Sequence, residues 1–114
     1  MQNKAGNFVA PDDTSFKSAA AAADWSKSFY QILTDQPGKD AWPITGATFI
    51  MMYKAQEKPV QGANSLKFFE WAFNNGDKMA TELEYVPLPD AVKTLVRGAW
   101  GEVKDSSGKA IAFK

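Results

Sequence analysis

The chain has 114 residues, enough for one domain, and its composition of 45% hydrophobic and 23% charged residues is that of an ordinary folded protein. Thirteen basic residues balance thirteen acidic ones, so there is no basic excess to neutralise a nucleic-acid backbone. The chain contains neither cysteine nor histidine, which excludes the common structural zinc sites and the catalytic triads built on those residues. We therefore expect no metal, no cofactor and no nucleic-acid partner.

The first predicted element is a helix that begins at Asp12 or Asp13 and ends near Ala23. Pro11 followed by two acidic residues is typical of a helix N-terminus, where the macrodipole favours negative charge. After this helix, residues 28–33 are open between a short helix and an irregular segment, and residues 34–39 are expected to form a loop. The apolar face of the helix would consist of Phe16, Ala19, Ala20 and Ala23.

The most informative stretch runs from Asp40 to Lys54 and indicates a turn followed by a strand. Pro43 fixes its own φ and favours extended geometry for the tryptophan before it. Residues Thr48 to Tyr53 are mostly β-branched, aromatic or apolar, without alternation of polarity, which is typical of a strand buried on both faces. Because a single strand cannot satisfy its own backbone groups, this strand needs neighbours.

Three further helices are predicted in the second half of the chain. One opens between Gly62 and Ser65 and ends at residues 74–76, and a short helix follows over residues 77–84. Residues 104–114 are expected to form a polar tail. The last helix begins at Asp90 and has the clearest helical periodicity, which is carried by Val92, Leu95, Val96, Ala99, Trp100 and Val103.

The four tryptophans are expected to pack in a core rather than to stack on sugars. Trp71 and Trp100 lie at helical spacing among apolar residues, which predicts core positions for both. Trp25 and Trp42 lie at element boundaries, where tryptophan commonly fills the edge of a core.

Few side chains are candidates for catalysis or ligand binding. Glu82 and Glu84 are two positions apart, which places them on different sides of a helix, so a solvated surface is expected rather than a catalytic pair. The predicted helix start near Ser65 lacks acidic residues and offers N–H groups to an anion, but we disfavour this site. Thr45 and Thr48 are expected to be structural. We predict no catalytic residue.

Several segments resemble, in order and in spacing, the C-terminal third of the periplasmic phosphate-binding proteins of bacterial ABC phosphate importers. The resemblance implies an α/β fold, namely the C-terminal portion of a two-lobed, type II-like periplasmic binding protein, with one or two strands and three to four helices in this chain. Members of that family are about three times longer, so the chain is expected to be a fragment. The matching segments are Asp40–Thr45, Lys58-Pro59, Leu66–Ala72, Leu88–Asp90 and Lys104–Lys109.

The resemblance also implies a division of the chain between two lobes. Residues 1–40 would be the tail end of the middle lobe, and residues 41–114 would be the segment that returns to the first lobe. The crossing near Trp42-Pro43 would make a hinge of Trp42, Pro43, Ile44 and Thr45. The family's phosphate-gripping motifs have no counterpart here, and Arg97 does not occupy one, so no phosphate-binding residue is expected in this chain.

The function implied is the capture of inorganic phosphate in the periplasm and its delivery to the membrane permease of the importer. Residues 1–6 have no apolar segment of the signal-peptide kind. The alternative is a small stand-alone or self-associating α-rich interaction module without small-molecule binding, which would associate through an unpaired strand edge. A hydrolase that uses Glu82 and Glu84 is the least supported possibility.

Overall fold

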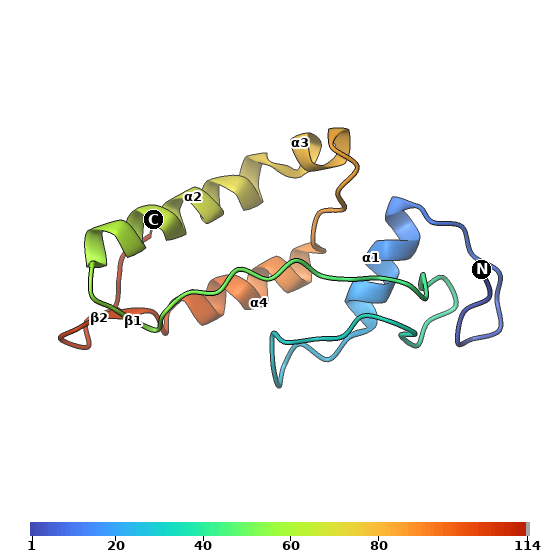
Figure 1. The fold of residues 1–114 in the computed structure, drawn as a ribbon, viewed down its shortest axis with the longest axis horizontal. Helices are drawn as coiled ribbons and strands as arrows, with labels where there is room; N and C mark the ends of the chain where they lie inside the picture. The colour runs from blue at the N-terminus through green and yellow to red at the C-terminus, as the bar shows by residue number, and fades with distance from the viewer. Residues whose placement is uncertain (114) are drawn as a thin grey trace.

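The computed structural model describes residues 1–113, and over that range the fold is mixed α/β, as predicted. Four helices accompany a single two-stranded parallel sheet in the described part of the chain (Figure 1). In chain order the elements are α1 (Asp13–Ala22), β1 (Ala55–Gln56), α2 (Pro59–Asn75), α3 (Asp77–Glu82), α4 (Asp90–Trp100) and β2 (Lys104–Asp105).

The described chain is elongated rather than spherical. Its extents are 52 × 30 × 17 Å and its radius of gyration is 16.2 Å, whereas a compact domain of this length has a radius of gyration of about 13 Å. Figure 1 shows α1 toward one end, the short sheet at the other, and α2 and α4 side by side between them. A chain of this shape leaves much of its apolar surface uncovered.

Helix α1 confirms the predicted start. The Asp12 carboxylate accepts a hydrogen bond from the Ser15 backbone N–H at 2.8 Å, and the Ser15 hydroxyl accepts one from the Asp12 N–H at 3.1 Å. This reciprocal capping box satisfies two backbone donors that a helix start otherwise leaves unpaired. Ala19 and Ala20 are buried, so the predicted alanine face is the packed one.

The predicted strand over residues 48–53 is wrong. Residues 45–53 belong to no sheet and run past α4 as one long stretch before they reach β1 (Figure 1). A run becomes a strand only when a neighbour pairs with it, and residues 1–113 supply no backbone partner to residues 46–52. The side chains of Ile50, Met51 and Tyr53 are exposed as a result.

The only sheet of the described residues is short and lies just beyond that stretch. Ala55 and Gln56 pair in parallel with Lys104 and Asp105, and the Lys104 N–H donates to the carbonyl of Lys54 at 2.7 Å. The predicted polar tail is therefore partly structured, since it contains β2 and a buried Ile111.

The turn after β2 is held by one carboxylate. The Asp105 Oδ1 accepts hydrogen bonds from the Ser107 hydroxyl, the Ser107 N–H and the Lys109 N–H at 2.6 to 3.0 Å. These donors, the hydroxyl foremost, hold the pKa of the Asp105 carboxyl below its usual value. Since the ionised form accepts these bonds, the turn is tightest above the ordinary aspartate pKa and loosens as the pH falls below it.

Helix α2 begins earlier than predicted. Pro59 occupies its first turn, where proline lacks only an N–H that the helix would not use and its fixed φ already suits the helix. The glycine and small polar residues at 62–65, where the sequence predicts the start of the helix, therefore lie inside it. The helix ends at Asn75 as predicted, but Gly76 has a right-handed φ of −87° rather than a left-handed one.

Helices α2 and α4 run in opposite directions and are joined through α3 (Figure 1). Their contact centres on Leu66, which is fully buried, and on Trp100, whose ring stacks on that of Phe73 at a centroid distance of 5.4 Å. Val103 and Ile111 complete this cluster. The short helix α3 ends at Glu82, two residues earlier than predicted, because Glu84 adopts a φ of +62°.

We predict that Leu66→Ala lowers the free energy of unfolding by about 2–5 kcal/mol, because it opens a cavity in the helix pair. Leu83→Ala is the matched control, since that leucine is exposed, and it should change stability by less than about 0.5 kcal/mol. Urea denaturation followed by circular dichroism measures both. Equal effects of the two substitutions would contradict this packing.

Candidate functional site

The segment predicted as a hinge is tied to the first 40 residues of the chain. The Trp42 N–H donates to the Ser15 carbonyl at 3.0 Å, and the Asp35 N–H donates to the Pro43 carbonyl at 2.9 Å. The buried Thr45 hydroxyl donates to the Trp42 carbonyl at 3.0 Å, which closes a local turn. Thr45 is thus structural, as expected. The backbone hydrogen bonds that hold this segment end with it, since residues 46–52 have no backbone partner within residues 1–113.

A hydrophobic cluster joins the two parts of the chain on either side of this segment. Trp25 and Leu33, from the first part, pack with Val92 at the start of α4. The Trp25 indole N–H donates to the Ala20 carbonyl at 2.7 Å, so its polar atom is satisfied inside the cluster. Trp25 therefore fills the edge of a core, as predicted.

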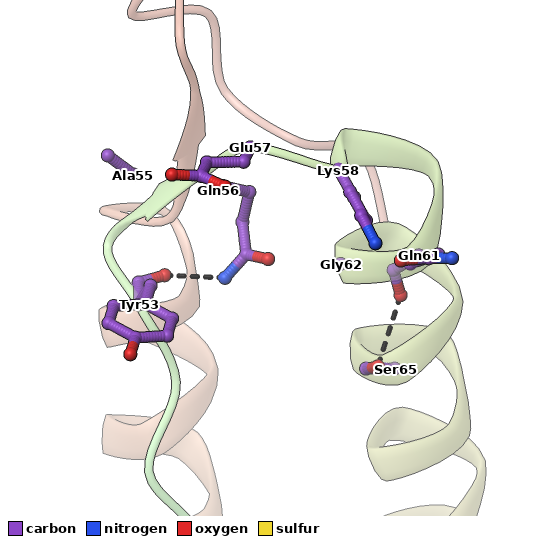
Figure 2. A pocket seen from close by; sticks show the side chains of 8 residues that line it. All are labelled: Tyr53, Ala55, Gln56, Glu57, Lys58, Gln61, Gly62 and Ser65. Atoms are coloured by element: carbon purple, nitrogen blue, oxygen red, sulfur yellow. Dashed lines mark hydrogen bonds between the residues drawn. The ribbon is translucent and has the colours of Figure 1, made fainter.

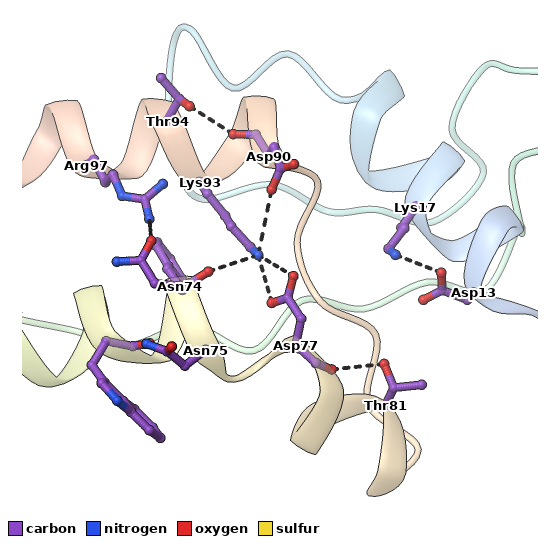
Figure 3. Close-up of polar contacts among 12 residues, drawn as sticks. Asp13, Lys17, Asn74, Asn75, Asp77, Thr81, Asp90, Lys93, Thr94 and Arg97 are labelled. Atoms are coloured by element: carbon purple, nitrogen blue, oxygen red, sulfur yellow. Dashed lines mark hydrogen bonds and ion pairs between the residues drawn. The ribbon is translucent and has the colours of Figure 1, made fainter.

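Lys93 is the most deeply buried cation of the described residues. Its side chain is 4% exposed, and its Nζ donates to both carboxylate oxygens of Asp77 at 2.6 and 2.7 Å and to the Phe73 carbonyl at 3.3 Å (Figure 3). The Asp90 carboxylate lies 3.8 Å away. Sequence reasoning missed this position, although Lys93 adjoins the apolar stripe of α4. The ion pair joins α4 to the start of α3.

Arg97 is also engaged within the helix pair. Its Nε donates to the Glu70 carboxylate at 2.7 Å and its terminal nitrogen donates to the Asn74 side-chain oxygen at 2.9 Å. Its guanidinium also lies over the Phe73 ring, 5.4 Å from the centroid. With its donors directed at α2, Arg97 serves helix packing rather than an open anion site.

A polar cavity of about 360 Å³ lies at the beginning of α2 (Figure 2). On one side of this cavity the Gln56 amide donates to the Tyr53 carbonyl at 2.6 Å, and on the other side, within α2, the Ser65 hydroxyl donates to the Gln61 carbonyl at 3.0 Å. Ser65 therefore lies within α2 and not at its start, which removes the basis of the anion site that we disfavoured there. The N-terminal N–H groups of α2 belong to residues near Pro59 instead.

The carboxylates of Glu82 and Glu84 do not lie in a pocket or cleft of the described residues. Both side chains are exposed; Glu82 pairs with Lys78 at 3.8 Å, and Glu84 sits in a turn after α3. Exposed carboxylates on different sides of a chain turn lack the defined separation that a catalytic acid pair requires. Within residues 1–113 no group of acidic residues is arranged to hold a metal ion, and no helix there is long and apolar enough to cross a membrane.

Apolar surface is the most prominent unfilled feature of the described chain. A groove of about 400 Å³ lies between residues 47–54, α2 and α4, and Trp25, Phe69 and Trp100 contribute to its walls. Trp100 is buried as predicted, but the prediction that Trp71 lies in a core is wrong: it is 49% exposed on the far side of α2. Helical spacing identified an apolar position without telling which neighbour covers it.

Comparison with known proteins finds several phosphate-binding proteins among the matches. No family model matches the chain. The phosphate-binding protein PstS of Pasteurella multocida is 46% identical over 97% of this chain and 33% of its own length. Those of Haemophilus influenzae and Methanocaldococcus jannaschii are 43% and 27% identical over 88% and 92% of this chain, and 30% of each relative's length is matched.

These matches confirm the resemblance found in the sequence. The chain spans about a third of the length of the phosphate-binding relatives it matches, and in those that are 43–46% identical the aligned part is roughly the C-terminal third.

We predict that Asp77→Asn destabilises the fold by about 1–3 kcal/mol, because the buried Lys93 ammonium loses its charged partner. Glu82→Gln removes an exposed ion pair in the same helix and should cost less than about 1 kcal/mol. Thermal unfolding of the two variants measures the difference. If Asp77→Asn were as mild as Glu82→Gln, Lys93 would not depend on this carboxylate.

Proposed function

Because this chain is related to the C-terminal third of PstS phosphate-binding proteins, we propose that it forms the corresponding part of a longer, two-lobed protein that captures inorganic phosphate. That protein would work in the periplasm and deliver phosphate to the membrane permease of an ABC importer. The relatives that are 43–46% identical are named for phosphate binding, and the proposal follows those names.

The observation that carries the proposal is the unpaired run over residues 46–52. Its backbone lacks hydrogen-bond partners within the backbone of residues 1–113, and three of its own side chains, those of Phe49, Ile50 and Met51, are exposed. In the longer protein, strands from the other two thirds would pair with this run and cover its faces. The groove beside α4 would then be filled by side chains of that sheet.

The hinge belongs to the same proposal. Trp42, Pro43 and Thr45 are bonded to residues 1–40 or to each other, whereas Ile44 is exposed and residues 46–52 have no backbone partner here. We place the crossing between lobes in this segment, with residues 1–40 on one side and residues 41–114 on the other. Lobe closure would pivot where the anchored part ends, next to the contact of Trp25 with Val92.

The phosphate ligands would come from the part of the protein outside this chain. The two cations best placed for a buried anion site, Lys93 and Arg97, are already paired with Asp77 and Glu70. A phosphate at either position would have to displace a carboxylate, which is unfavourable. Self-association through the unpaired run stays a prediction, because the same edge would be used by the rest of the protein.

We predict that this chain alone gives no binding heat with micromolar inorganic phosphate in isothermal titration calorimetry. A chimera in which it replaces the aligned third of the Pasteurella multocida relative should bind phosphate, because the missing ligands are then restored. The unmodified relative is the positive control.

Tight binding by this chain alone would overturn the assignment of the ligands to other residues. A chimera that is folded by circular dichroism yet silent toward phosphate would contradict the proposed function itself.

A further inference from the structure

Helix α2 has two apolar faces rather than one. With 100° between successive residues, Leu66 and Phe73 lie on the face toward α4, and Val60, Phe68 and Trp71 lie on the opposite side. The inner face is packed, Leu66 being fully buried. The outer residues are 73%, 61% and 49% exposed, in that order. A helix with large apolar residues on opposite sides is expected between two layers, and only one layer is present.

Two of the outer side chains already pack against each other. The rings of Phe68 and Trp71 stack with centroids 6.3 Å apart and planes 20° from parallel, and the Phe68 ring also meets the edge of Phe69 at 5.8 Å. Lys67 is the one ionic side chain on this side of α2, which also carries Asn64 and Asn75. We call Val60, Phe68 and Trp71 the outer aromatic face.

The neighbouring helix provides a contrast within the same structure. The side of α4 away from its core carries Ala91, Thr94 and Gly98, with Leu95 as its single large apolar residue. That is the composition of a surface in contact with water. The outer aromatic face is therefore a particular feature of α2 and not a general property of the helix pair.

The composition of the outer aromatic face favours a permanent cover over a transient partner. Aromatic and aliphatic residues with almost no charge resemble a core divided in two, whereas surfaces that dock and release are more polar. The matched relatives are about three times as long as this chain, so ample polypeptide exists to form such a cover.

We propose that an apolar layer from the remaining two thirds of the longer phosphate-binding protein packs on the outer aromatic face. Helix α2 is then the middle of a three-layer arrangement, with α4 on one side and that added layer on the other. This inference rests on the proposed function, because it takes its cover from the same longer protein. It does not depend on the strand pairing proposed for residues 46–52, because a helix packs through its side chains and not through backbone hydrogen bonds.

The test compares the double variant Phe68→Gln/Trp71→Gln in two settings. In this chain alone both side chains are exposed, so the melting temperature should stay within about 2 °C. In the chimera with the Pasteurella multocida relative the same change should lower it by on the order of 10 °C, because two buried aromatic rings are lost. Ala91→Gln, on the outer side of α4, is the control and should leave both settings unchanged.

A second measurement covers the case in which the double variant fails to fold. Trp71→Phe keeps an apolar ring, so this variant should fold. In the chimera, the tryptophan fluorescence that the variant loses should be fluorescence that acrylamide does not quench. In this chain alone, the lost fluorescence should be fluorescence that acrylamide does quench. If the chimera binds phosphate but neither its melting temperature nor its acrylamide quenching changes with these substitutions, the inference fails and the proposed function stands.

Other occupants give different results. If this chain alone is a dimer in sedimentation and the double variant makes it a monomer, with no effect in the chimera, a second copy is the occupant and the inference is wrong. If the unsubstituted chimera is folded but does not bind phosphate, the proposed function fails whatever the variants show.

Discussion

Backbone N–H and C=O groups taken out of water require hydrogen-bond partners, and residues 46–52 have no backbone partner within residues 1–113. The side chains of this run are those of a strand buried on both faces, so solvent is a poor substitute for neighbouring strands. Only its continuation finds a partner, where Ala55 and Gln56 meet Lys104 and Asp105. The groove beside α4, the exposed Phe49 to Met51 and the elongated shape all follow from this single unmet requirement.

The helical part behaves differently because its requirements are met locally. Helix backbones satisfy themselves, Leu66 and Trp100 provide a small core, and the ion pairs of Lys93 and Arg97 fix α4 against α3 and α2. All of these contacts lie within residues 66–111, so they need no partner from elsewhere in a longer protein. The outer side of α2 is the exception, because Phe68 and Trp71 there are exposed and no part of residues 1–113 covers them.

Sequence reasoning succeeded where structure is decided by local rules. The cap at Asp12, the end of α2 at Asn75 and the start of α4 at Asp90 follow from capping chemistry and helical period, and the fold class and the family resemblance also held.

Sequence reasoning failed where a distant neighbour decides the outcome. The apolar run after Thr45 reads as a strand but lacks a partner, and Trp71 reads as core but lacks a cover. The burial of Lys93 depends on Asp77, sixteen residues away on another helix, which no period reveals. The start of α2 differs from the prediction because Pro59 occupies the first turn of the helix, which the apolar period that begins at Leu66 does not reach.

Amide hydrogen exchange over residues 46–53 tests the central claim most directly, measured by mass spectrometry on this chain at low concentration and on the chimera with the Pasteurella multocida relative. The account predicts exchange near the unprotected rate in the chain alone, and exchange slowed by at least about 100-fold in the chimera, where strands pair with the run. Protection in the chain alone equal to that of helix α4 would show that the run already has its partners, and would contradict the account.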